Sequence, residues 1–223
     1  MLKINEFPEL ATLADNDLLL IWDTSANITA KVQLSTLKAF LGTTGGTTGN
    51  TPTTTKELTY ASNGDTNGLA YFIGTQEGTV AWQNPHNNGL SMSASDIAAG
   101  TIDSLVDRQP SEFYTSSIDN SWVELIISSG SLKCNYYSIR NRSNVDHYLR
   151  NWKFQGSNDG SVWADLDVRT NNITLSSPSQ WLSFPITTTN FYTQFRLLQN
   201  GLNSAGYAYL CLGEIELYGT YTY

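Results

Sequence analysis

The chain has 223 residues and a formal net charge of −8 at neutral pH, with 14% charged and 12% aromatic residues. That length suits one ordinary domain with an appendage, and six Trp and twelve Tyr are enough to fill a core. The negative charge disfavours a phosphate backbone as partner, and no apolar run approaches the length of a membrane span, so we expect neither nucleic-acid binding nor membrane insertion.

Residues 1–42 predict a small module made of a β-hairpin and a short helix. Apolar runs at 18–23 and 27–32, separated by a short polar stretch, are typical of paired strands. Ser35 then caps a predicted helix over 36–41. A module this small cannot bury its own apolar side chains, so we expect copies of the chain or a neighbouring protein to cover it.

Residues 43–57 predict a linker. The stretch is rich in Thr and Gly and contains Pro52, so its Gly part is flexible and the part near Pro52 stiffer. The linker sets the boundary of a larger domain at 58–223.

The larger domain predicts an antiparallel β-sandwich, because short strand patterns alternate with turn clusters and no long helical period appears. Its clearest unit is 149–163, where Trp152 and Phe154 alternate with polar residues, an Asn-Asp-Gly turn follows, and Trp163 restarts the pattern. The predicted strands lie near 71–74, 91–94, 122–127, 136–141, 151–155, 181–185, 191–198 and 209–218.

Catalytic motifs are missing from the sequence, and we expect no enzyme activity. The two histidines, His86 and His147, stand beside turn residues and outside any nucleophile, phosphate-loop or zinc-helix motif. Glu214 and Glu216 would share one face of a strand, which suits acid–base chemistry only if that face lines a cleft. Solvated or structural carboxylates are the alternative.

The larger domain resembles the discoidin-like (coagulation factor C-type) domains of the galactose-binding-like fold. The resemblance rests on 68–75, on 149–163 and on the ending Leu212-Gly-Glu-Ile-Glu-Leu-Tyr-Gly, and it extends over about 58–218. It implies a jelly-roll sandwich. Many discoidin domains join their two ends by a disulfide, but Cys134 lies in mid-domain, so we expect Cys134 and Cys211 to be small buried residues instead.

The same resemblance implies a possible structural calcium ion, as in related lectins. The corresponding positions are the Asp107 side chain, carbonyls near Ser104 and Gln109, and Glu214, and oxygen ligands of this kind suit calcium. Arg108, however, stands where the pattern prefers Gly, and its positive charge would oppose a metal. Pairing of Asp107 with an Arg is the alternative.

The resemblance also implies carbohydrate recognition by loops rather than by a sheet face. Sugar binding needs polar planar side chains beside an aromatic face, and the loop 140–147 holds the densest set of donors. Arg142 falls where fucose-binding relatives contact sugar, and we expect it to offer a free planar fork to a hydroxyl pair or an acidic sugar. The alternative is that Arg142 and His147 are merely solvated. The candidate glycan-binding residues are Arg140, Arg142, Asn144, His147, Asn203 and Tyr207.

The N-terminal module resembles a module of phage tail-fibre and other virion proteins, through the pattern that begins at Ile4, includes Asp17, Asp23 and Lys31, and ends at Leu41. The resemblance implies a virion structural protein of a tail fibre or tail tip that binds host-surface glycans. We expect it to be made in the bacterial cytoplasm, to join other virion proteins through this module, and to form a homotrimer. A capsid or tail decoration (cement) protein with a purely structural role is the alternative.

No basic region followed by an apolar run is visible at the N-terminus, so the sequence predicts no secretory signal. We therefore expect a protein that acts outside the cell to leave it by lysis or as part of a particle.

Overall fold

The computed structural model describes residues 18–23, 28–33 and 54–223, and it separates into two compact units at Thr53/Thr54. In the first unit, β1 (Leu18–Asp23) pairs antiparallel with β2 (Ile28–Gln33), which confirms the predicted hairpin. The predicted helix at 36–41 and most of the linker lie outside the described residues.

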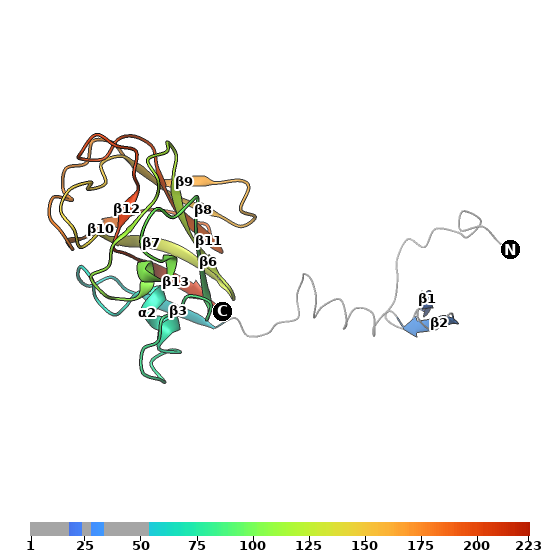
Figure 1. The fold of residues 1–223 in the computed structure, drawn as a ribbon. Helices are drawn as coiled ribbons and strands as arrows, with labels where there is room; N and C mark the ends of the chain where they lie inside the picture. The colour runs from blue at the N-terminus through green and yellow to red at the C-terminus, as the bar shows by residue number, and fades with distance from the viewer. Residues whose placement is uncertain (1–17, 24–27, 34–53) are drawn as a thin grey trace. The chain divides into compact units, whose positions relative to one another are not determined.

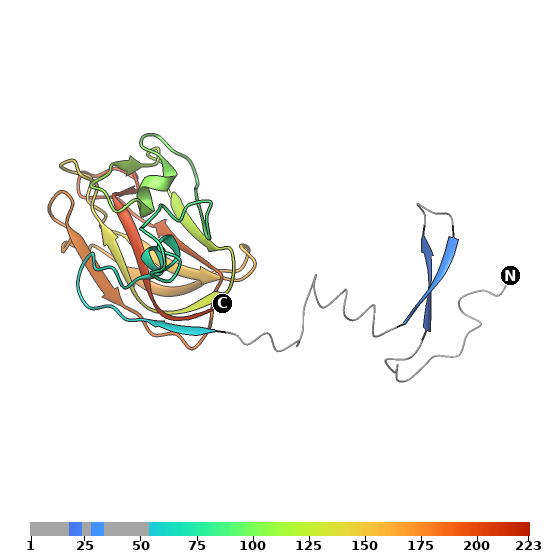
Figure 2. The same ribbon diagram turned by 90° about the horizontal axis from the view of Figure 1, so that it is seen from below.

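The second unit is an antiparallel β-sandwich, as predicted (Figures 1 and 2). One sheet has four strands in the order β10-β7-β13-β3, and the other has five in the order β4-β6-β11-β8-β9. A two-stranded pair, β5 with β12, lies apart from both sheets. The strands are β3 (Thr55–Leu58), β4 (Leu90–Ala94), β5 (Phe113–Tyr114), β6 (Trp122–Ile127), β7 (Ser131–Arg140), β8 (Trp152–Ser157), β9 (Ala164–Arg169), β10 (Trp181–Pro185), β11 (Gln194–Gln199), β12 (Cys211–Leu212) and β13 (Glu214–Thr222).

Alternating apolar residues build the core between the two sheets. In β6, Val123, Leu125 and Ile127 are buried while the residues between them are half-exposed. Phe154 of β8 stacks on Tyr137 of β7 with ring centroids 4.2 Å apart, so aromatic side chains join the two sheets. Removing a fully buried aromatic ring of this kind costs about 3–5 kcal/mol of stability.

The prediction of a strand at 71–74 is wrong, because this segment belongs to a short helix, α2 (Leu69–Gly74). Glu216 of β13 accepts hydrogen bonds from the backbone N–H groups of Ala70 (2.7 Å) and Tyr71 (3.2 Å) and so satisfies the start of the helix. The side chain that does this lies far along the chain, and a short apolar run alone does not distinguish a helix from a strand.

Some strands also begin or end at other residues than predicted. β3 begins at Thr55, inside the stretch assigned to the linker, because it pairs with the end of β13 and so satisfies its backbone groups. A predicted strand at 209–218 is divided at Gly213, where an added Cβ would lie 2.7 Å from the Asn141 carbonyl oxygen. A short 3₁₀ helix, η2 (Ile102–Val106), precedes β5.

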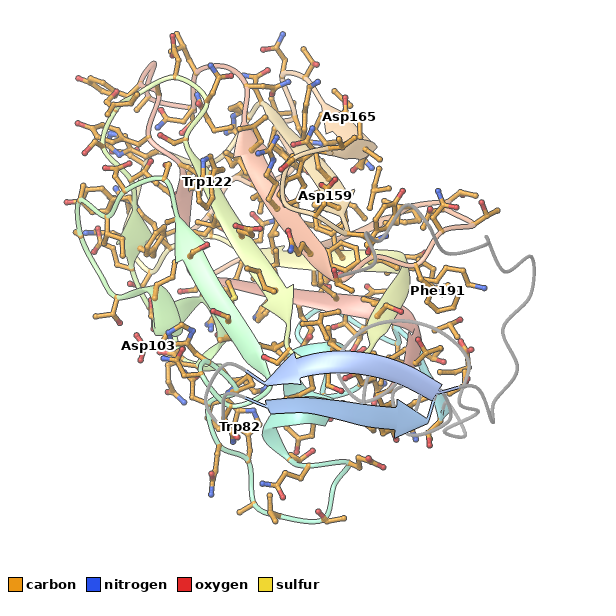
Figure 3. The ribbon with its side chains drawn as sticks, turned by 90° about the vertical axis from the view of Figure 1, so that its right-hand side faces the viewer. Trp82, Asp103, Trp122, Asp159, Asp165 and Phe191 are labelled. Atoms are coloured by element: carbon orange, nitrogen blue, oxygen red, sulfur yellow. The ribbon has the colours of Figure 1, made fainter. Side chains whose placement is uncertain are left out.

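The sandwich has two different ends. The proximal end is where the chain enters at Thr54, whose backbone exchanges hydrogen bonds of 2.9 and 3.0 Å with Tyr223; Figure 1 places the C-terminus beside β3. The distal end is formed by the loops 141–151, 170–180 and 200–210 and by the parts of 95–121 next to β4, β5 and β6, whereas Asp103 of η2 lies nearer Trp82 in Figure 3. In Figure 3, Trp122 at the start of β6 lies toward the distal end, whereas Trp82 and Phe191 lie toward the other.

Hydrogen bonds between backbone groups join the distal loops to one another. Thr115 donates to Leu210 (3.1 Å), Ser204 to Tyr148 (2.9 Å) and Ser179 to Arg142 (3.0 Å). The distal end is therefore a packed surface of connected loops. Among the residues that the structure describes, no helix is both long and apolar enough to span a bilayer.

Candidate binding site

A pocket of about 320 Å³ opens at the distal end. Three segments meet there: the β5 segment, the loop after β7, and the chain before β12. They meet because Tyr114 of β5 pairs with Cys211 of β12, and because Ser143 donates to the Ser111 carbonyl at 3.0 Å. The lining residues are Glu112, Tyr114, Arg142, Asn144, His147, Tyr209 and Cys211.

Arg142 forms the polar floor of this pocket and is only 9% exposed. Its Nη1 donates to Glu112 Oε1 at 2.9 Å, and its Nη2 donates to the Val145 carbonyl and to His147 Nδ1, each at 3.0 Å. Its guanidinium also lies over the Tyr114 ring, 5.6 Å from the centroid. Arg142 is thus not the free fork, nor the merely solvated side chain, that the sequence suggested.

These contacts determine the tautomer of His147. A guanidinium has only N–H donors, so His147 Nδ1 must be the acceptor in their contact. The ring proton of neutral His147 is then on Nε2, which can donate to a ligand. Three N–H groups of Arg142 donate within the protein, and its Nε is buried without a partner, so Arg142 mainly positions the groups around it.

Glu112 balances the charge of Arg142 and remains partly open to solvent. Its side chain is 34% exposed, and its second oxygen has only a long contact of 3.4 Å from Asn144 Nδ2. The pocket therefore combines a carboxylate acceptor, an amide and a ring N–H donor, while the paired charges of Glu112 and Arg142 cancel.

Tyrosine rings form the apolar wall. Tyr207, which is 50% exposed, lies with its ring centroid 5.5 Å from His147 and 5.5 Å from Tyr209. Its loop is fixed by buried Asn203, whose Oδ1 accepts from the backbone N–H groups of Ala205 (3.0 Å) and Tyr207 (3.2 Å). An exposed aromatic face is thus held rigidly beside the polar groups.

The sequence-predicted residues divide into three groups. Arg142, Asn144 and His147 line the pocket, and Tyr207 stands at its rim. Asn203 shapes the loop from below and does not line the pocket. Arg140 lies elsewhere, because its Nη1 pairs with Glu214 at 3.1 Å and its guanidinium lies 5.7 Å from the centroid of the Trp181 ring.

Glu112, Tyr114 and Tyr209 were missed by sequence reasoning. They come from the two-residue pairing of β5 with β12, which is too short to give a strand pattern. The sequence signal for these residues was weak: Glu112 and Tyr114 stand on either side of one apolar residue, Phe113, which the structure shows to be fully buried.

The calcium site stays a prediction, and two of its predicted ligands have partners within the protein. The Asp107 oxygens accept from Gln109 N (2.7 Å) and Ser111 Oγ (2.9 Å), which closes a local turn, while Glu214 pairs with Arg140. Within the described residues no group of three or more His, Cys, Asp or Glu side chains is placed to hold a metal.

Arg108 instead places its own positive charge beside a buried carboxylate. The residue has φ of 62°, the left-handed conformation that favours Gly, and its Nη2 donates to the carbonyls of Gly64 (3.0 Å) and Asp65 (3.1 Å). Its Nη1 lies 3.8 Å from Glu216, and its guanidinium lies over the Tyr71 ring. These partners of Arg108 are not among the predicted calcium ligands.

The two glutamates of β13 are structural. Both are buried: Glu216 accepts three backbone N–H bonds, from Ala70, Tyr71 and Leu217, and Glu214 pairs with Arg140. Burial raises the pKa of Glu216 to about 7, against the lowering effect of its donors, and likewise raises the pKa of Glu214 to about 7. Neither residue lines the distal pocket.

Both cysteines are buried, as the sequence predicts. Burial raises the pKa of the Cys134 thiol to about 12, and that of Cys211 to about 12. Cys211 therefore contributes to the pocket as a neutral apolar surface.

Comparisons with known proteins agree with the fold. No family model matches the chain. The BTB/POZ domain-containing protein At2g30600 of Arabidopsis thaliana is 31% identical over 179 residues, 74% of this chain and 22% of that protein. The E3 ubiquitin-protein ligase Ufd4 of Drosophila melanogaster is 28% identical over 173 residues, 73% of this chain and 6% of that protein. The chain thus spans less than a quarter of the curated relatives that it matches.

Two solved structures are similar to the sandwich. The module CpGH89CBM32-5 from Clostridium perfringens, in complex with GalNAc-β-1,3-galactose, has a TM-score of 0.50 at 12% identity, covering 59% of this chain and 96% of that one. The module CBM32-3, from a family 31 glycoside hydrolase of the same organism, has a TM-score of 0.51 at 13% identity, covering 59% and 91%. Residues 54–223 therefore have the galactose-binding-like β-sandwich fold of these carbohydrate-binding modules, as the discoidin-like resemblance implies.

Proposed function

We propose that this protein is a phage virion protein, part of a tail fibre or tail tip, whose sandwich binds a neutral glycan on the host surface. The observation that carries the proposal is the distal pocket, where Glu112, Asn144 and His147 present polar groups beside the exposed ring of Tyr207. The fold shared with carbohydrate-binding modules supports it. On this proposal the protein acts by binding and not by catalysis.

The chemistry of the pocket favours a neutral sugar. A sugar hydroxyl can donate to the open oxygen of Glu112 while a neighbouring hydroxyl accepts from His147 Nε2, and the apolar face of the sugar ring can lie against Tyr207. The N–H groups of Arg142 that donate are already used within the protein. An acidic sugar would meet Glu112 without a free cation in return, which argues against the acidic ligand considered from the sequence.

The position of the pocket suits display. The chain enters the sandwich at Thr54 at the proximal end, and the pocket lies among the distal loops. The N-terminal module, which resembles virion modules, would join the chain to other virion proteins as a homotrimer. Three or more weak sites on one particle bind a cell surface far more tightly than one, so modest affinity for a single glycan is sufficient.

A glycan array probed with the full chain tests this function. Tyr207→Ala removes the exposed ring, and Val162→Ala is the matched control because Val162 is exposed in the proximal loop after β8. We expect one set of neutral glycans to bind the wild type and the control, and binding to fall by about tenfold or more in Tyr207→Ala. Absence of binding to every glycan would contradict the proposal.

A decoration or cement protein remains the second candidate. The observation that favours it is the internal use of Arg142, whose bonds to Glu112, Val145 and His147 could serve only to brace the loops. On that alternative, the array is blank and the distal loops contact another virion protein.

A further inference from the structure

A second pocket, of about 360 Å³, opens at the distal end and has no part in the site described above. Its lining residues are Asp119, Asn120, Asn200, Gly201 and Leu202. We propose that it is a second sugar subsite, so that the ligand is a neutral oligosaccharide bound across both pockets. This inference rests on the proposed glycan function and specifies its ligand.

The two pockets lie along the same pair of loops. The first loop supplies Tyr114 to the Arg142 pocket and Asn120 to the second pocket, while the loop after β11 supplies Tyr209 and Asn200 in the same way. Tyr114 and Asn120 are six positions apart in the first loop. Because an extended chain spans about 3.3–3.6 Å per residue, the backbones of these two lining residues are no more than about 20 Å apart.

The seam between these loops is closed by hydrogen bonds, so the two pockets keep a fixed spacing. The Thr115 N–H donates to the Leu210 carbonyl (3.1 Å), the Leu210 N–H to Thr115 Oγ1 (3.1 Å), and the Ala208 N–H to Ser117 Oγ (3.1 Å). An oligosaccharide of a few units is long enough to reach across a distance within this limit. A preformed spacing also lowers the entropy lost on binding.

Each pocket has one exposed apolar side chain beside it: Tyr207 at the rim of the first and Leu202 in the lining of the second. The Leu202 carbonyl accepts from Asn151 Nδ2 at 2.7 Å, and the Asn203 N–H donates to the Tyr207 carbonyl at 2.8 Å. These bonds fix the backbone of both residues while their side chains remain in solvent. Rigid apolar groups of this kind can contact sugar rings that pass from one pocket to the other.

The second pocket has the polar groups that hydroxyls require. Asn120 and Asn200 each offer an amide acceptor and two donors, and Asp119 adds a carboxylate. Asn120 has φ of 64° and its N–H donates to Gln199 Oε1 at 3.1 Å, so the backbone of the loop is held in this conformation. No cationic side chain lines this pocket, which again favours a neutral sugar over an acidic one.

Calorimetric titration of the full chain tests the subsite. The probes are the strongest-binding oligosaccharide from the glycan array and the monosaccharide that forms its terminal unit. We expect the wild type to bind the oligosaccharide about tenfold or more tightly than the monosaccharide. The double variant Asn200→Ala/Leu202→Ala should bind the oligosaccharide no more tightly than the monosaccharide, whereas Val162→Ala should keep the wild-type ratio.

The outcomes separate this inference from the proposed function. If no array glycan binds, both fail. If glycans bind but the wild type does not distinguish the two probes, or if the double variant keeps the wild-type ratio, the second subsite is wrong and the first pocket stands. Equal loss for both probes together with a lowered melting temperature would show that Asn200 and Leu202 act through folding, and would also overturn the subsite.

Discussion

Two arginine–carboxylate pairs in the sandwich differ in a way that separates structural from binding chemistry. Arg108 lies beside Glu216 in the interior, where Glu216 is 2% exposed and also caps α2. Arg142 pairs with Glu112 at the distal end, where the Glu112 side chain is 34% exposed. We call Arg108 with Glu216 the closed unit, because its carboxylate is buried. We call Arg142 with Glu112 the half-open unit, because the second oxygen of Glu112 remains open to solvent.

The largest expected effect comes from breaking the closed unit. Glu216→Ala leaves the buried N–H groups that it accepts from without their acceptor and removes the carboxylate beside half-buried Arg108, so we expect a loss of about 3–5 kcal/mol in the free energy of unfolding. Urea denaturation measures it. Glu57→Ala on exposed β3 is the control, with an expected change within about 0.5 kcal/mol. Equal small losses in both variants would contradict the structural role of Glu216.

Burial of the two glutamates of β13 also predicts a pH dependence of stability. Burial raises the pKa of Glu214 and Glu216 from 4.5 to about 7, so between these values the folded protein binds more protons than the unfolded chain. Stability should therefore fall as pH rises from about 5 to 8, by up to roughly 3 kcal/mol for each carboxyl. Thermal unfolding across this range checks the sign, and Glu216→Gln should flatten the dependence. A melting temperature that rises steadily with pH would show that burial does not raise the pKa of these carboxyl groups.

The half-open unit should be less costly to break. Arg142→Ala removes a nearly buried guanidinium, but the exposed side of Glu112 can hydrate, so we expect a loss of about 1–3 kcal/mol. Lys153→Ala, which removes a more exposed ion pair with Asp165, should cost at most about 1 kcal/mol. The comparison fails if Arg142→Ala destabilises the protein as much as Glu216→Ala does.

Calcium chelation should have the smallest effect. Arg108 supplies the positive charge beside Glu216, and the predicted ligands around Asp107 are engaged in local hydrogen bonds. We expect the melting temperature of the wild type to be the same with a chelator and with excess calcium. A lower value with the chelator, absent in Asp107→Ala, would restore the calcium site implied by the resemblance.

Sequence reasoning succeeded where a residue's role depends on its neighbours in the chain. The alternation around Trp152 and Phe154 gives the strand, the core position and the fold class. It failed where the partner is distant in the sequence. The helix at α2 depends on Glu216, which lies 146 residues from Ala70.

The binding site shows the same division. The loop residues Asn144 and His147 could be predicted because they stand within one polar run. Glu112 could not, because its segment meets that loop through the bond from the Ser143 N–H to the Ser111 carbonyl, and this contact between distant parts of the chain leaves no pattern in the sequence. For the same reason, the free fork expected of Arg142 was wrong: the sequence does not show that Glu112 lies within 2.9 Å of it.

The central claim is that a glycan binds among the distal loops and not on a sheet face. The most direct test is an NMR titration of the isotopically labelled full chain with the strongest-binding oligosaccharide from the array. We predict that the largest shift changes occur at Glu112, Asn144, His147 and Tyr207, around the Arg142 pocket. Changes centred instead on Trp122 and Asp165 of the five-stranded sheet, which Figure 3 labels, or no changes at all, would contradict the claim.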